Sequence, residues 1–150
     1  MSYLKKASVH KNYRINHGHQ LLGTPGGPHL KPIAGFVFGY APELIDTSGA
    51  QVALMPIPSD LPEIPNQIFD APLAGENIVF TDERMLMKCV MPQGVVPPGQ
   101  VVNHNLTGIV DTDGALMFMA LDFRTELTAE DPFEVNLYLD MPEVIYGGDE

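Results

Sequence analysis

The sequence has few of the residues that carry redox, metal-thiolate or stacking chemistry. Among its 150 residues there is one cysteine, Cys89, and no tryptophan. A single cysteine excludes an intrachain disulfide, a zinc site of the CxxC type and a redox pair within one chain. No apolar run reaches about 18 residues, and the opening MSYLKKASVH lacks the apolar stretch of a signal peptide. We therefore expect a soluble protein that is assembled in the cytoplasm.

Acidic residues are absent from the first 42 positions. Five of the eight basic residues lie there, which gives this segment a formal charge of +5. Residues 43–150 hold all 19 acidic residues and three basic ones, a formal charge of −16. Because so acidic a body repels nucleic-acid phosphates and anionic lipid, neither nucleic acid nor membrane is expected as a partner.

Residues 1–32 differ from the rest of the chain in pattern as well as in charge. They lack sustained apolar periodicity and end in GTPGGPHLKP, whose glycines and prolines disfavour helices and central strands. We expect an extended N-terminal arm, with at most a short helix near residues 3–9, followed by one body over residues 33–150. Charge complementarity predicts that the arm binds a neighbouring subunit. Its candidate contact residues are Tyr3, Lys5, Lys6, Lys11, Tyr13, Arg14, Leu21 and Leu22.

Short apolar runs separated by turn residues fill the body, as antiparallel strands require. Asp113-Gly114 is the strongest hairpin signal, and Asp82-Glu83 separates two runs that favour a second hairpin over the alternative of a helix starting at Thr81. Five prolines exclude regular structure from residues 56–72. No helix of ten or more residues is predicted, so the fold class is all-β, an antiparallel β-sandwich. The expected strands are residues 33–40, 51–57, 77–81, 84–91, 106–111, 115–123 and 134–141.

Four of the five histidines lie at or before Lys31. His17-Gly18-His19 brings two imidazoles close together, and three chains around a threefold axis would offer six nitrogens to iron or zinc. Such an arrangement resembles the iron sites at the tips of trimeric phage tail spikes and fibres. We favour an arm whose histidines hydrogen-bond a neighbouring protein, without a cofactor, and keep the shared metal site at His17 and His19 as the alternative.

No catalytic constellation stands out. Cys89 lies among apolar residues, as a buried thiol does, and His104 is the only histidine of the body. We therefore predict that the protein is not an enzyme. The remaining catalytic alternative is a metal-dependent enzyme that uses His10, His17, His19 and His29.

Two C-terminal segments carry a family resemblance. NLTGIVDTDGALMFMALDF (105–123) and EDPFEVNLYLDM (130–141) resemble the closing strands of the β-sandwich in the virion-attached N-terminal regions of phage tail fibres and in related tail-collar or baseplate proteins. The resemblance implies a structural virion protein: a tail, collar, baseplate-adaptor or capsid-decoration subunit. It implies a homo-oligomer, with a trimer favoured, and other virion proteins as partners. The alternative is a carbohydrate- or ligand-binding β-sandwich module, which predicts exposed aromatic residues on one sheet face.

Overall fold

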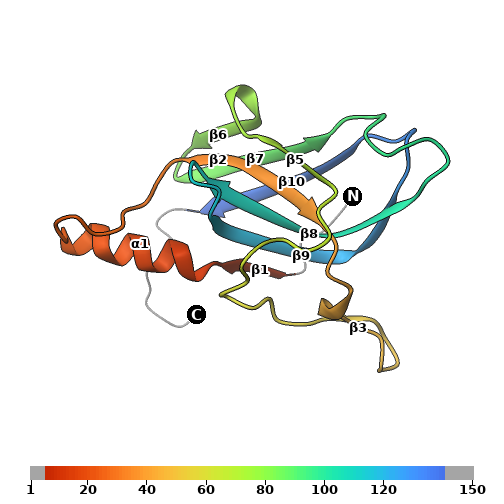
Figure 1. Ribbon diagram of the computed structural model, residues 1–150, viewed down its shortest axis with the longest axis horizontal. Coiled ribbons are helices and arrows are strands. Elements are labelled where there is room, and N and C mark those ends of the chain that lie inside the picture. Colours follow the sequence, from red (N-terminus) through yellow and green to blue (C-terminus); the bar gives the residue numbers. More distant parts are fainter. Residues whose placement is uncertain (1–5, 141–150) are drawn as a thin grey trace.

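The computed structural model describes residues 6–140, which form antiparallel sheets and one α-helix (Figure 1). The predicted all-β class is therefore confirmed. In their order across the five-stranded sheet, the strands are β1 (Lys6–Val9), β9 (Leu116–Leu127), β8 (Val102–Asp111), β2 (Ile33–Gly39) and β5 (Phe69–Pro72). The three-stranded sheet contains β10 (Phe133–Asp140), β7 (Arg84–Met91) and β6 (Ile78–Thr81), and a small hairpin contains β3 (Ile45–Asp46) and β4 (Ala53–Leu54).

The N-terminal segment corrects two predictions. Residues 6–9, where a short helix was considered, form β1 and pair with β9. The next residues form α1 (Lys11–Leu22), so the expectation of an arm extended throughout and without a longer helix is wrong. The sequence pattern failed here because α1 buries none of its residues, and a helix without a buried face needs no apolar stripe. Gly23 ends the helix in the left-handed conformation at φ 68°.

Both predicted hairpins are present. Asp82 and Glu83 connect β6 to β7 with φ values of 51° and 68°, which excludes the helix considered from Thr81. Gly114, at φ 82°, lies in the turn between β8 and β9. The strand expected over residues 51–57 is reduced to β4, and β5 corrects the expectation that residues 56–72 lack regular structure. Two short 3-10 helices, η1 (Pro42–Leu44) and η2 (Gly75–Asn77), precede β3 and β6.

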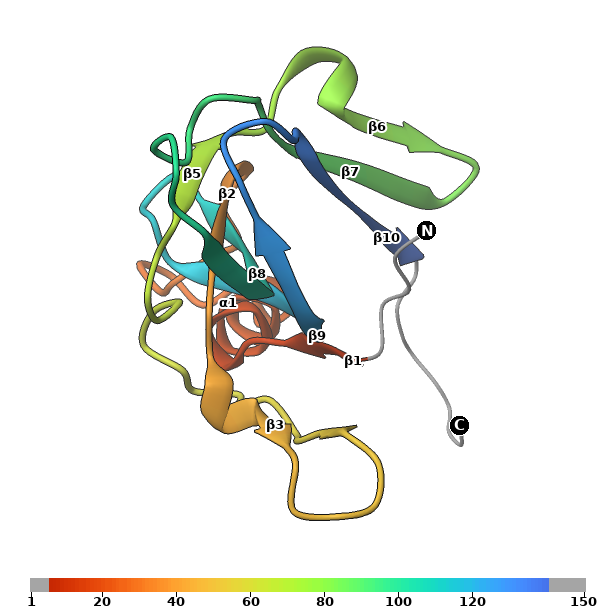
Figure 2. The same cartoon turned by 90° about the vertical axis from the view of Figure 1, so that its right-hand side faces the viewer.

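Side chains from both larger sheets form the main core. Figure 2 shows β2, β8 and β9 on one side of this core and β7 and β10 on the other. Cys89 is fully buried there, as its sequence context predicts. The buried side chains of this core include Phe36, Phe38, Met87, Met91, Ile109, Phe118, Val135 and Leu137.

A second core lies on the other face of the five-stranded sheet, under the proline-rich segment. Ile64 is only 2% exposed and fills space that two glycines of neighbouring strands leave open. A Cβ atom on Gly108 would lie 2.7 Å from Ile64 Cγ1, and one on Gly39 would also meet Ile64. The face of β2 that carries Gly39 is therefore covered by the proline-rich segment, and the contact with Ile64 holds that segment on the sheet.

Candidate functional site

The first candidate site is α1, and its structure begins with a buried histidine. His10 is 4% exposed and forms the N-cap of the helix. Its Nδ1 accepts a hydrogen bond from the Asn12 N–H at 2.9 Å, so its Nε2 is the donor toward the Leu61 carbonyl oxygen, 2.6 Å away. Both ring nitrogens are thus used within the chain. His10 fixes the start of the helix to the proline-rich segment and has no nitrogen left for a metal.

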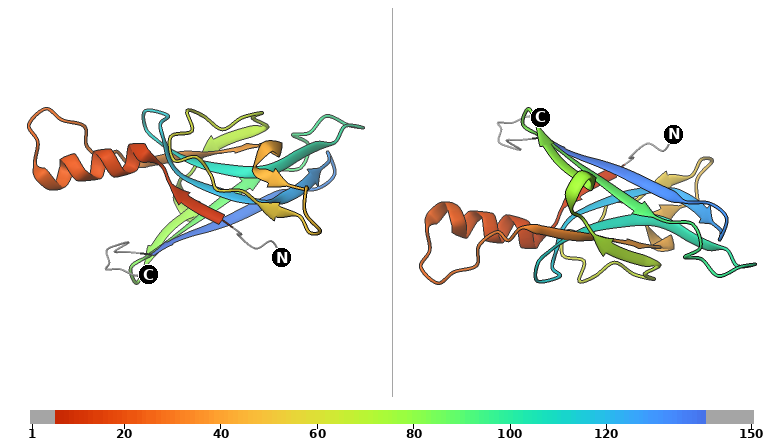
Figure 3. Two further views of the ribbon diagram at one scale, coloured as in Figure 1. Left: turned by 90° about the horizontal axis from the view of Figure 1, so that it is seen from below. Right: turned by 90° about the horizontal axis from the view of Figure 1, so that it is seen from above.

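The first turn of α1 also packs on β9. The Tyr13 ring lies 4.8 Å from the Phe118 ring, and Asn12 Nδ2 donates to the Leu116 carbonyl oxygen at 3.3 Å. Beyond this turn the helix projects away from the sheets, as the two views of Figure 3 show. No local sequence pattern indicates this anchoring, because the partners of the helix lie in distant parts of the chain.

α1 exposes basic side chains in its first turn and apolar side chains in the part that projects. Leu21 is 76% exposed and Leu22 is 80% exposed, and Ile15 is exposed as well. Lys11 and Arg14 of the first turn are also exposed, and the helix contains no acidic residue. A 12-residue helix is marginally stable alone in water, so this one depends on its anchored first turn or on a partner. An exposed apolar surface of this kind is suited to binding another protein.

The predicted contact residues are distributed unevenly. Tyr3 and Lys5 lie outside the described residues, and the backbone of Lys6 belongs to β1. Tyr13 packs within the chain against Phe118. The other four residues are exposed side chains of α1: Lys11 and Arg14 in its first turn, and Leu21 and Leu22 in its last.

The two histidines of the predicted metal site lie on the same helix. Residues two positions apart point about 200° away from each other around a helix axis, so His17 and His19 do not face one ion. His17 contacts the Tyr13 ring at 5.5 Å, and His19 Nδ1 lies 3.2 Å from Thr24 Oγ1. In residues 6–140, no three His, Cys, Asp or Glu side chains gather as a metal site requires. The shared threefold site remains a prediction, without support from the helix geometry.

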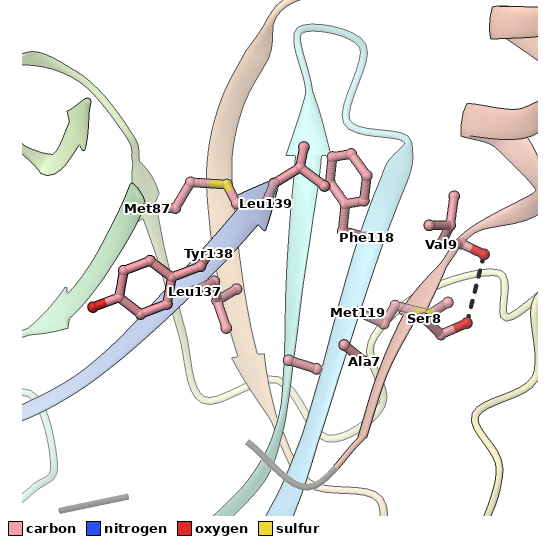
Figure 4. A pocket seen from close by; sticks show the side chains of 10 residues that line it. Ala7, Ser8, Val9, Met87, Phe118, Met119, Leu137, Tyr138 and Leu139 are labelled. Carbon is pink, nitrogen blue, oxygen red and sulfur yellow. Dashed lines mark hydrogen bonds between the residues drawn. The ribbon is translucent and has the colours of Figure 1, made fainter. Parts of the chain in front are cut away.

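A second candidate is an apolar groove of about 150 Å³ between β1 and β10. Figure 4 shows side chains of β1, β9 and β10 around it, including Val9, Phe118 and Leu139. Among the described residues that line it, Ser8 and Tyr138 carry hydroxyl groups, and Ser8 donates to the Val9 carbonyl oxygen at 3.5 Å. These described lining residues offer a mostly apolar surface for packing and include no carboxylate, histidine or lysine.

Two further hollows share Tyr40. One is lined by amide side chains, including Asn66 and Asn103, and by apolar residues. The other is lined by Tyr40, Ile45, Val52, Phe123 and Arg124. Sequence reasoning missed both, because each combines short segments that only the folded chain brings together.

The remaining reactive side chains are part of the core. His104 is 2% exposed, lies between the Phe38 and Phe133 rings at 4.8 Å from each, and has its Nε2 2.9 Å from Thr107 Oγ1. Burial lowers the pKa of His104 to about 4 and raises the pKa of the Cys89 thiol to about 12. Both groups are thus held uncharged and away from solvent, as structural residues are.

A comparison with models of known protein families, with curated proteins and with solved structures finds no match to this chain. None of the helices in the described part of the chain has the length and apolar character that crossing a lipid bilayer requires.

Proposed function

We propose that this protein is a structural subunit of a bacteriophage virion, in the tail, collar, baseplate or capsid decoration, that assembles through α1. The observation that supports the self-assembly is the projecting helix, which exposes Leu21 and Leu22 and contains no acidic residue, in a chain whose residues 43–150 have a formal charge of −16. The complementary charges favour contact between copies, and the leucines supply apolar area for affinity.

The architecture is consistent with this function. Two antiparallel sheets contribute to one core, which we interpret as a β-sandwich. The strands of the family resemblance, β8, β9 and β10, are central or long members of these sheets. We favour a trimer with other virion proteins as further partners, and no catalytic activity.

The first test is the mass of the full-length protein in solution, measured by light scattering over a range of concentrations. We expect an oligomer for the native chain and a monomer for the Leu21→Ser/Leu22→Ser variant. Val79→Ser on β6, a change at another exposed apolar residue, is the matched control and should keep the oligomer. A native chain that stays monomeric throughout would contradict self-assembly.

The virion location needs a second measurement. The protein should sediment with intact phage particles purified on a density gradient from a lysate of producing cells, detected by mass spectrometry. Its presence only in the soluble fraction would contradict a structural role in the particle.

A neutral-ligand module is the second candidate, because of the amide-lined hollow. The Asn103 Oδ1 atom there is buried and has no partner among the described residues, and Asn66 adopts a positive φ of 48°. Both features occur at binding sites. Binding of neutral oligosaccharides on a glycan array, lost in Asn103→Leu, would support this candidate, and a blank array would remove it.

A further inference from the structure

A hollow of about 740 Å³ lined by Val52 and Phe123 opens beside the β3–β4 hairpin. This hairpin lies toward the opposite end of the molecule from α1 (Figures 1 and 3). Val52 is 51% exposed and Phe123 is 37% exposed, and Tyr40 and Ile45 extend the apolar lining. This end of the chain therefore presents a concave apolar surface, whereas α1 presents a convex one.

Arg124 is the charged residue that lines this hollow, and its Nη2 atom lies 3.7 Å from Glu126 Oε2, so the two charges offset each other. The exposed Glu43 follows the lining residue Pro42. The acidic character of the receiving copy comes from the body as a whole, since residues 43–150 have a formal charge of −16.

We propose that this hollow receives the last turn of α1 from a second copy of the chain, an inference that rests on the proposed self-assembly. Leu21 and Leu22 enter the apolar hollow. Lys11 and Arg14 lie roughly 10–17 Å back along the helix axis and face the acidic surface of the receiving copy. The helix contains no acidic residue and the receiving body is acidic, so the two are complementary in charge, and the exposed leucines match the apolar lining of the hollow.

The helix and the β3–β4 hairpin lie toward opposite ends of the long axis, so one molecule cannot fill its own hollow. The contact therefore joins the helix tip of one copy to the hollow of another, head to tail. Two copies that exchange helices, a closed ring and a filament all satisfy this contact.

Cross-linking between engineered cysteines tests the contact directly. The Leu22→Cys/Val52→Cys chain is treated with a short bismaleimide, and the products are separated on a denaturing gel. Cys89 does not compete, because it is fully buried and its pKa is about 12. We expect covalent multimers for this pair. The Leu22→Cys/Val79→Cys chain is the matched control and should remain at the monomer mass, as should both single-cysteine variants.

Light scattering on the same variants distinguishes self-assembly itself from the particular contact between α1 and the hollow. Multimers that form only with the pair at positions 22 and 52 support the head-to-tail contact. An oligomer that yields no such cross-link, or yields it equally with the control pair, overturns this contact and leaves the proposed self-assembly standing. A monomer at every concentration of native protein overturns both.

Discussion

Acidification should weaken the packing between the two larger sheets through one imidazole, that of His104. Its ring extends from β8 into the core and contacts Phe133 of β10 at 4.8 Å. Its Nδ1 atom is buried and has no hydrogen-bond partner among the described residues. Burial lowers the pKa from 6.5 to about 4, while the charge of Asp122 and a hydrogen bond with the Leu106 backbone oppose part of this change.

The sign and size of the effect follow from proton linkage. Below about pH 6.5 the unfolded chain binds a proton at residue 104, whereas the native protein does so only near pH 4. Since the native state binds fewer protons in this window, its free energy of unfolding falls as the pH falls. The full stability contribution is present above pH 6.5, and about 3 kcal/mol is lost by pH 4.

Urea unfolding between pH 7.5 and pH 4 measures this loss, with His104→Gln as the comparison. Both chains share the titration of their carboxylates, so the difference between their two pH profiles isolates the imidazole. We expect the native chain to lose about 3 kcal/mol more than the variant over this range. Parallel profiles would show that His104 keeps an ordinary pKa in the folded protein, and would refute the reasoning.

Three further predictions concern other buried positions. Gly108→Ala places a Cβ atom 2.6 Å from Leu116 Cδ2 and 2.7 Å from Ile64 Cγ1, and should cost about 1–3 kcal/mol in urea unfolding. The cost should shrink in an Ile64→Ala background, and strict additivity would contradict this account. His10→Ala removes the cap of α1 and should cost about 1–3 kcal/mol, with amide exchange in α1 faster than in the sheets; unchanged exchange in α1 would count against the anchor. Cys89 should react with a thiol reagent at pH 8 only as fast as the protein unfolds, and rapid reaction in the native state would disprove its burial.

The strands were predictable where alternation and turn chemistry agreed. β7 occupies the predicted residues 84–91, because apolar residues alternate there and a two-residue turn precedes them. β5 was missed because Pro72 reads as a strand breaker, although it stands at the end of an edge strand where a proline is tolerated.

The candidate site was less predictable than the sheets. The sequence identified the charge of the N-terminal segment but not its conformation, since α1 buries no residue and has no periodic apolar face. His10 anchors the helix through a hydrogen bond to the Leu61 carbonyl group, 51 residues away in the sequence, and no local sequence pattern indicates such a bond. The hollow at Val52 and Phe123 depends in the same way on segments distant in sequence.

The two ends of α1 differ in what they contribute to folding. The first turn is fixed by His10 and Tyr13, whose contacts lie within the chain. The last turn carries Leu21 and Leu22, which are at least 76% exposed and therefore add little to the stability of the isolated chain. In the proposed assembly these leucines gain their burial from a second copy. The absence of acidic residues from the same segment fits this proposal, because it would align the helix with an acidic surface before the leucines make contact.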